Sequence, residues 1–210
     1  MRPLLLVMTL PFGPLRVIHA DDRLVIVDKP SGLLSVPGRT EPDCASARVQ
    51  ALYPDALIVH RLDQATSGLL LFARGPEAQR ELSADFAERR VHKTYIALVG
   101  GQLSGSGCID LPLSADWPNR PRQQVDHLQG KPSQTLWRAV ACDGETTRVH
   151  LEPITGRSHQ LRVHLAALGH PILGDALYAP PELAAARSRL MLHASALQIA
   201  GHHFQSEPEF

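Results

Sequence analysis

The stretch HRLDQATSGLLLFAR, residues 60–74, carries the strongest structural signals in the chain. Residues 60–68 show neither helical nor strand periodicity and predict a loop, whereas residues 68–74 form a near-continuous apolar run that predicts a buried strand. Asp63 therefore lies in a loop that leads into a buried strand, where a carboxylate is well placed to meet a ligand. The alternative is that Asp63 only hydrogen-bonds its own turn, the commoner role of a loop aspartate. These residues alone leave both interpretations open.

Around this stretch the sequence predicts an α+β fold built on a mixed sheet. The predicted strands are residues 15–20, 23–28, 68–74, 92–100, 108–112, 133–141, 147–153 and 190–199, the first two forming a hairpin. The predicted helices are residues 43–53, 76–90, 158–169 and 181–189. Asp43 and Ser158 are the expected N-caps of the first and third helices, and Arg89 and Arg90 are expected to close the second.

Length and composition limit the class of protein. The chain has 210 residues, with 21 Lys and Arg against 21 Asp and Glu, so any RNA binding must depend on local positive charge. The size predicts one globular domain, and no apolar run reaches the roughly 18 residues of a membrane-spanning helix. Three separated cysteines without a C-x-x-C pair favour a reducing cytoplasm. We interpret residues 1–13 as a short N-terminal extension, with Met8 as an alternative start, and residues 14–210 as a single domain.

A cationic segment without acidic residues spans residues 153–174. It contains Arg157 and Arg162 together with His159 and His164, and a basic helix start suits an anion such as phosphate. A solvated cationic face is the other interpretation. The two histidines are five residues apart, so they point in different directions on a helix or a strand, and no cysteine lies near them. This spacing argues against a metal site.

Two further features invite interpretation. In the loop DWPNRPRQQ, residues 116–124, Trp117 with Arg120 and Arg122 can stack on and clamp single-stranded RNA, although a plain surface loop has the same composition. Tyr95 lies in the middle of a predicted strand, where core packing with a bonded hydroxyl is the default. Glycine-rich phosphate-binding motifs and the serine-hydrolase motif do not occur, so no nucleotide cofactor is indicated.

Five blocks of sequence, in order, resemble the RluA family of pseudouridine synthases. They are DKPSGL (28–33), HRLDQATSGLLLFA (60–73), KTYIA (93–97), PITGRSHQLRVHL (153–165) and LGHPILGD (168–175). The resemblance covers roughly residues 15–210 and implies the pseudouridine synthase fold: a mixed, mainly antiparallel sheet flanked by helices, with a central active-site cleft. Three further blocks, at 31–39, 116–121 and 131–135, resemble a subgroup without an S4 RNA-binding domain. Members of that subgroup modify uridine 32 of the tRNA anticodon loop and uridine 746 of 23S rRNA.

The resemblance also implies roles for residues at matching positions. Asp63 matches the catalytic aspartate, and Arg162 the arginine that pairs with the catalytic carboxylate and keeps it ionised. Tyr95 matches the tyrosine that packs on the target base, and Tyr95 or a water is the candidate for removing the proton from C5. Arg61 matches the arginine that enters the RNA stack when the target base leaves it. Further expected RNA contacts are His60, Arg120, Arg122, Arg157 and His159. The implied enzyme is a cytoplasmic monomer that acts on tRNA and 23S rRNA without a cofactor or a metal.

The implied chemistry suits these residue types. Pseudouridine formation breaks the C1′–N1 bond of uridine, turns the uracil and joins C5 to C1′, and a carboxylate is a suitable partner for the electron-poor C1′. Asp63 can attack C1′ or remove a proton from C2′, and the sequence does not choose between these routes. One alternative is a non-catalytic RNA-binding protein on the same scaffold. Another is a hydrolytic glycosidase, which normally needs two carboxylates.

Overall fold

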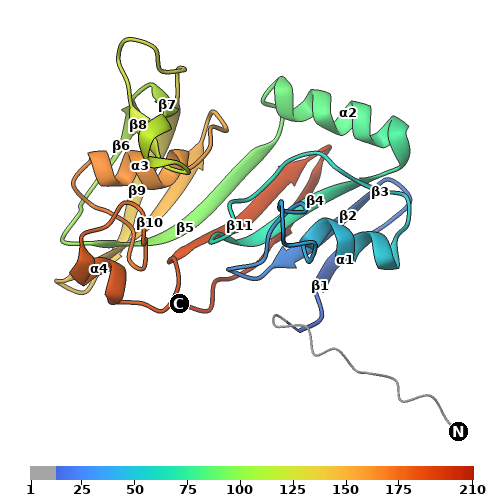
Figure 1. Cartoon of the computed structure of the whole chain (residues 1–210), viewed down its shortest axis with the longest axis horizontal. Helices are drawn as coiled ribbons and strands as arrows, with labels where there is room; N and C mark the ends of the chain where they lie inside the picture. The colour runs from blue at the N-terminus through green and yellow to red at the C-terminus, as the bar shows by residue number, and fades with distance from the viewer. Residues whose placement is uncertain (1–12) are drawn as a thin grey trace, which may run out of the picture.

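A ten-stranded sheet forms the framework of the molecule, and the computed structural model describes residues 13–210 (Figure 1). The strands are β1 (Arg16–Ala20), β2 (Leu24–Lys29), β3 (Ala56–Ile58), β4 (Ser67–Arg74), β5 (His92–Gly100), β6 (Ser106–Asp110), β7 (Leu113–Ala115), β8 (Gln123–Val125), β9 (Gln134–Cys142), β10 (Thr146–Pro153), β11 (Leu192–Ile199) and β12 (His202–Gln205). The helices are α1 (Ala45–Leu52), α2 (Gly75–Ala87), α3 (Gln160–Ala167) and α4 (Pro181–Ala185), with a 3₁₀ turn at Trp117–Asn119.

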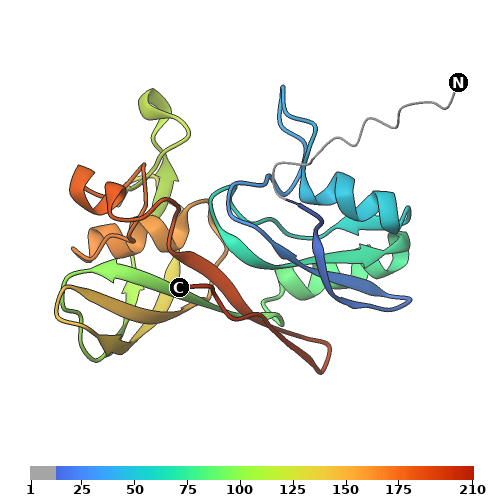
Figure 2. The ribbon, with the colours of Figure 1, turned by 90° about the horizontal axis from the view of Figure 1, so that it is seen from below.

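The sheet has two halves that meet at β11. Its strand order is β1-β2-β4-β11-β5-β10-β9-β6, with β3 added to β4 and β12 to β11, while β7 and β8 form a separate hairpin. Figures 1 and 2 show β1–β4 with α1 and α2 in one half, and β5–β10 with α3 and α4 in the other. Within residues 13–210, β4 and β11 are the parallel pair and the other strand pairs are antiparallel. This mixed, mainly antiparallel sheet confirms the predicted α+β class.

The junction between the halves depends on Gly68. Its φ is +109°, and a Cβ at this position would lie 2.4 Å from the carbonyl oxygen of Ala194. Only glycine allows β4 to approach β11 this closely without a clash. Because Gly68 is the second residue of β4, this contact fixes the point at which the preceding loop enters the sheet.

Helices cover both faces of the first half. α2 packs through Leu82 on one face of β2 and β4, and α1 packs through Val49 on the opposite face. In the second half, α3 packs through Leu161 and Leu165 on β5 and β10. β4 is therefore buried on both sides, which explains why its sequence is apolar at successive positions rather than alternating.

The start of α1 differs from the prediction. The N-cap is Cys44, whose Sγ accepts the N–H of Ala47 at 3.4 Å, and not Asp43. The carboxylate of Asp43 instead accepts two hydrogen bonds from the guanidinium of Arg48, at 2.6 and 2.5 Å. Asp43 therefore forms an ion pair with Arg48 and does not cap the helix.

Other helix ends also differ from the prediction. α2 ends before Arg89 and Arg90, and Arg89 adopts a φ of +60°. α3 begins after His159, which has a φ of +53°, and Ser158 does not cap it. The side chain of Gln160 accepts hydrogen bonds from the preceding turn instead. α4 is shorter than predicted, and the short strands β3, β7, β8 and β12 were not predicted.

Two further predictions concern the N-terminal extension and the lack of a membrane-spanning helix. The predicted extension of residues 1–13 lies outside the described residues, apart from Gly13. Between residues 13 and 210, the helices are too short or too polar for any of them to cross a membrane.

Candidate active site

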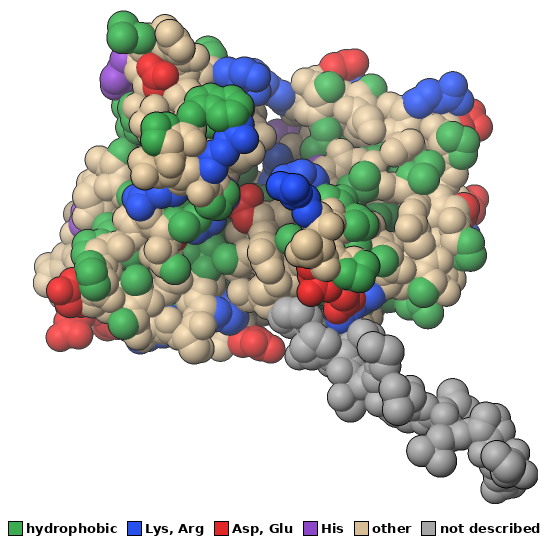
Figure 3. Space-filling view, viewed as in Figure 1, with side chains coloured by type: hydrophobic (Ala, Val, Ile, Leu, Met, Phe, Trp, Pro, Cys, Tyr) green, Lys and Arg blue, Asp and Glu red, His purple; other side chains and the backbone are tan. Residues whose placement is uncertain are grey.

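A cleft of about 900 Å³ lies between the two halves of the molecule. Figure 3 shows this hollow with Lys, Arg and His side chains inside it and on its rim. The lining brings together all the predicted site residues except Arg120 and Arg122: His60, Arg61, Asp63, Tyr95, Arg157, His159 and Arg162. A smaller hollow of about 470 Å³ shares Asp63, His159 and Arg162 with the main cleft. These three side chains therefore stand at the boundary of two cavities.

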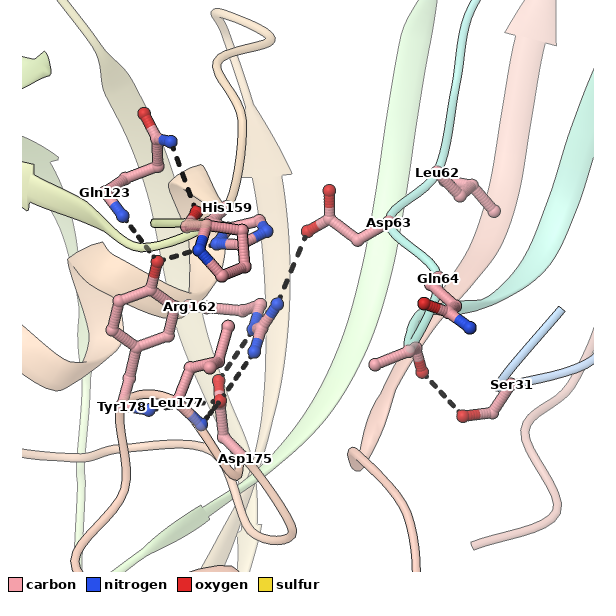
Figure 4. Close-up of polar contacts among 12 residues, drawn as sticks. Ser31, Leu62, Asp63, Gln64, Gln123, His159, Arg162, Asp175, Leu177 and Tyr178 are labelled. Carbon is pink, nitrogen blue, oxygen red and sulfur yellow. Dashed lines mark hydrogen bonds and ion pairs between the residues drawn. The ribbon is translucent and has the colours of Figure 1, made fainter. Parts of the chain in front are cut away.

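Asp63 is positioned through the backbone of its loop. The hydroxyl of Ser35 accepts the N–H of Leu62 at 3.1 Å and lies 2.7 Å from its carbonyl oxygen, to which it donates. The hydroxyl of Ser31 donates to the carbonyl oxygen of Ala65 at 2.6 Å. These bonds hold the residues on both sides of Asp63 and leave its carboxylate, 28% exposed, directed into the cleft (Figure 4).

Lys29 lies fully buried beneath this loop. Its ammonium donates to the carbonyl oxygens of Pro30, Leu33 and Gln64, at 3.0, 2.8 and 3.1 Å. Burial lowers the pKa of Lys29 to about 7, while the negative charge of Asp63 acts in the opposite direction. Lys29 thus ties two loops together behind Asp63, a role that was not predicted for the DKPSGL block.

Arg162 is buried on α3, and its main partner is Asp175 rather than Asp63 (Figure 4). Its Nε and Nη2 donate to the two carboxylate oxygens of Asp175 at 2.8 and 2.7 Å, whereas Nη1 lies 3.9 Å from Oδ2 of Asp63. Burial opposes the charge of Arg162, but the hydrogen bonds to Asp175 together with the negative charges of Asp175 and Asp63 outweigh it, so the pKa of Arg162 is raised. The guanidinium is therefore a permanent cation between two carboxylates.

Asp175 was not predicted as a site residue. The available signal was its position as the first acidic residue after the acid-free segment of residues 153–174. A buried arginine needs a carboxylate partner, and this residue is the nearest acid that follows the segment.

His159 and Tyr178 adjoin Arg162. The hydroxyl of Tyr178 lies 2.6 Å from Nδ1 of His159 and accepts the N–H of Gln123 at 2.8 Å (Figure 4). The guanidinium carbon of Arg162 lies 5.0 Å from the centroid of the Tyr178 ring. Burial lowers the pKa of His159, although the negative charge of Asp63 opposes this shift. Tyr178 was not predicted as a site residue.

Tyr95 on β5 lines the cleft and packs against the apolar clusters of both halves. Burial raises the pKa of its hydroxyl, and the negative charge of Asp63 raises it further. Near neutral pH, Tyr95 is therefore a phenol. It offers the cleft a flat apolar face and a hydrogen-bond donor rather than a base.

His60 makes its contacts inside the protein. Its Nε2 accepts the N–H of Leu71 at 3.0 Å, and its ring stacks on Phe86 with the centroids 4.6 Å apart. Burial lowers the pKa of His60 to about 3, and the charge of Lys93 contributes. A neutral His60 anchors the start of the Asp63 loop and brings no positive charge to the cleft.

Exposed arginines surround the cleft. Arg61 and Arg157 line it. Arg120 and Arg122 lie outside the lining, in the loop that joins β7 to β8, and the guanidinium carbon of Arg120 lies 3.3 Å from the centroid of the Trp117 ring. Trp117 is 68% exposed. Positive charge is thus local, as the neutral composition requires of an RNA-binding surface.

Comparison with known proteins identifies the family. Residues 23–167 match the family model described as RNA pseudouridylate synthase. The chain belongs to this family. It is 52% identical over 204 residues to the dual-specificity RNA pseudouridine synthase RluA of Yersinia pestis, covering 92% of this chain and 99% of that protein. It is 54% identical over 187 residues to the protein of the same name from Escherichia coli K12, covering 87% and 85%.

Solved structures similar to this pseudouridine synthase have the same fold. Human RNA pseudouridylate synthase domain containing 1 superposes with a TM-score of 0.79 at 28% identity, covering 93% of this chain and 83% of that one. Human RNA pseudouridylate synthase domain containing 4 has a TM-score of 0.77 at 23% identity, covering 92% and 89%. The predicted membership of the RluA family and the predicted fold are confirmed. The chain is an RNA pseudouridine synthase, an isomerase of uridine in RNA.

Proposed function

We propose that Asp63 carries out the bond-changing step of pseudouridine formation, with Arg162 and Tyr95 beside it. One observation supports this assignment most strongly. Within residues 13–210, the carboxylate of Asp63 has a single polar contact, the 3.9 Å ion pair with Arg162, and it faces the cleft. A carboxylate without short hydrogen bonds is free to approach a ribose.

The reaction begins when the target nucleotide leaves the RNA stack, because the C1′–N1 bond is otherwise inaccessible. Unstacking costs a few kcal/mol. Arg61 is exposed at the cleft and offsets this cost by placing its planar guanidinium in the vacancy. Trp117 and Arg120 stack on a neighbouring unpaired nucleotide, and Arg122, Arg157 and His159 complete the RNA-binding surface. His60 contributes by holding the start of the Asp63 loop from inside the protein.

Asp63 then attacks C1′, or takes a proton from C2′, and the C1′–N1 electron pair leaves with the uracil. Arg162 stays cationic and balances the negative charge that develops in the cleft. The uracil turns and C5 bonds to C1′ as the Asp63–C1′ bond breaks or, on the other route, as Asp63 returns the proton to C2′. C5 then loses a proton and N1 gains one. No atom is gained or lost overall and no redox change occurs, and the proposed reaction includes neither a cofactor nor a metal.

Tyr95 holds the detached base. Its ring face packs against the uracil while the base turns, and the raised pKa of its hydroxyl keeps it protonated near neutral pH. The proton released from C5 therefore passes to water or to another acceptor. The apolar surroundings of Tyr95 exclude bulk water, which limits loss of the free base.

The RNA targets follow from the relatives and from the sequence blocks. The relatives in Yersinia pestis and Escherichia coli are named as dual-specificity enzymes, which supports two kinds of RNA target. The subgroup blocks favour uridine 32 of the tRNA anticodon loop and uridine 746 of 23S rRNA. In this proposal residues 14–210 act as a single catalytic domain, as a monomer in the cytoplasm.

The test is pseudouridine mapping by carbodiimide modification and primer extension. Unmodified tRNA and 23S rRNA transcripts are treated with the wild type and with Asp63→Asn. Stops at both expected uridines with the wild type alone support the catalytic role of Asp63 and the dual specificity. Stops at one uridine narrow the substrate, and stops that persist with Asp63→Asn contradict the role of Asp63.

A further inference from the structure

We propose that Tyr178 is a positioning residue, which couples the β7–β8 hairpin to the Asp63–Arg162 pair through His159. The inference rests on the proposed function, because it assigns a role to Tyr178 in the same cleft. Tyr178 does not appear in the lining of either hollow. It acts through the groups that do line them.

The hydroxyl of Tyr178 joins two segments that are far apart in the sequence. It accepts the backbone N–H of Gln123, the first residue of β8, at 2.8 Å. A phenol has one proton of its own, and that proton is free to be donated to Nδ1 of His159, 2.6 Å away. One oxygen thus holds both the hairpin and the residue that precedes α3 (Figure 4).

This arrangement selects one tautomer of His159. Burial lowers its pKa below the ordinary value for histidine, so near neutral pH the ring is mainly uncharged. A neutral imidazole whose Nδ1 accepts a hydrogen bond carries its proton on Nε2. His159 therefore presents an Nε2–H donor at the boundary of the two hollows, next to Asp63 and Arg162.

The ring of Tyr178 has a second set of contacts. The guanidinium carbons of Arg162 and Arg122 lie 5.0 and 5.4 Å from its centroid. Its own backbone N–H donates to Oδ1 of Asp175 at 3.2 Å, the same carboxylate that holds Arg162. Tyr178 is therefore linked to Arg162 through its ring and through Asp175, and to His159 through its hydroxyl.

Through these contacts the β7–β8 hairpin is connected to the side chains that act on the ribose. Arg120 and Arg122 are exposed in the segment between β7 and β8, and the residue after Arg122 is hydrogen-bonded to Tyr178. RNA that engages the two arginines orders this segment and with it the hydroxyl that orients His159. Loss of the hydroxyl should consequently affect the reaction step more than the binding of RNA.

The test compares Tyr178→Phe with the wild type on tRNA and 23S rRNA transcripts. This substitution keeps the ring, and with it the contacts to Arg162 and Arg122, and removes only the hydroxyl. We expect the single-turnover rate constant for pseudouridine formation to fall about 10-fold or more, because small displacements of positioned groups are costly. We expect the Kd for RNA to change by less than about twofold, since no RNA contact is removed. Tyr53→Phe is the matched control, because Tyr53 is a half-buried tyrosine outside both hollows, and it should match the wild type.

A second measurement uses the protein without RNA. Nitrogen-15 NMR of the histidine rings should show His159 as the Nε2–H tautomer in the wild type and in Tyr53→Phe, and a tautomer mixture in Tyr178→Phe. An unchanged His159 spectrum in Tyr178→Phe, or a reaction rate equal to that of the wild type, overturns the inference. A wild type that forms no pseudouridine on either transcript contradicts the proposed targets instead, and the NMR result then still decides whether Tyr178 orients His159.

Discussion

The two walls of the cleft are built by different means. On one wall the Asp63 loop is held by backbone carbonyl and N–H groups, through the hydroxyls of Ser31 and Ser35 and the buried ammonium of Lys29. On the other wall Arg162 is held by a charged side chain, the bidentate carboxylate of Asp175. The carboxylate of Asp63 itself takes no part in holding its own wall.

Because of this difference, the carboxylate proposed to react is not one of the groups that hold the site together. A nucleophile or base must keep its electron pairs available, so its position is best fixed through its neighbours in the chain. A counter-ion has the opposite requirement, because a buried guanidinium without a partner is strongly unfavourable. The comparison predicts that substituting Asp63 on the first wall changes activity without changing stability. Substituting a residue of the Arg162–Asp175 pair on the second wall should change both.

The largest effect is expected from Asp63→Asn. Turnover on tRNA and 23S rRNA transcripts should fall by about 1000-fold or more, because an amide neither attacks C1′ nor removes a proton. The free energy of unfolding, from urea titration, should stay within about 0.5 kcal/mol of the wild type, since the carboxylate holds nothing in place. A clear loss of stability would show that the carboxylate supports its own wall, and the contrast between the walls would fail.

Asp175→Asn should affect stability and activity together. It leaves the guanidinium of Arg162 buried without its bidentate partner, which costs about 3–5 kcal/mol of unfolding free energy. Asp55→Asn is the matched control, because it removes the ion pair between Asp55, whose side chain is 47% exposed, and Arg74. It should lower the free energy of unfolding by at most about 1 kcal/mol. Similar urea midpoints for the two variants would mean that burial of the Arg162–Asp175 pair adds nothing.

The same contrast explains what the sequence could and could not reveal. The place of Asp63 was predictable because it depends on a local pattern, a loop followed by an apolar strand. The partners of that loop were not predictable, because Ser35 and Leu62 meet only after the chain has folded, and no periodicity connects them. The contact of Asp175 with Arg162 crosses a turn and was missed for the same reason. The cap at Cys44 was missed because cysteine is not among the usual capping residues.

Lys29→Met tests the support of the first wall. The substitution leaves the carbonyl oxygens of Pro30, Leu33 and Gln64 without their donor, which should cost about 3 kcal/mol. The pH dependence gives a second readout. The folded-state pKa of Lys29 is about 7 against an ordinary 10.5, so between these values the unfolded chain binds more protons and the wild type gains stability as pH rises.

Urea midpoints measured across this pH window check both expectations. The difference in unfolding free energy between the wild type and Lys29→Met should grow as pH rises from about 7 towards 10.5. It should shrink again when the pH is lowered back to about 7. Parallel stability curves for the two proteins would show that Lys29 stays charged in the folded chain. In that case its three carbonyl partners fully compensate for its burial.

The smallest effect is expected from Arg61→Ala, because the Arg61 side chain lines the cleft but does not support either wall. Arg61 is exposed, so stability should be unchanged, and the loss should appear only where the target base must leave a stack. We expect kcat/KM to fall about 10-fold on the folded tRNA anticodon arm and less than about threefold on a short flexible oligonucleotide, which has little stacking to replace. Arg138→Ala serves as the control, because Arg138 is an exposed arginine outside both hollows. Its kcat/KM relative to the wild type should be the same on the two substrates. Equal losses on both substrates with Arg61→Ala would assign Arg61 to phosphate binding, because a charge contact does not depend on how the base is stacked.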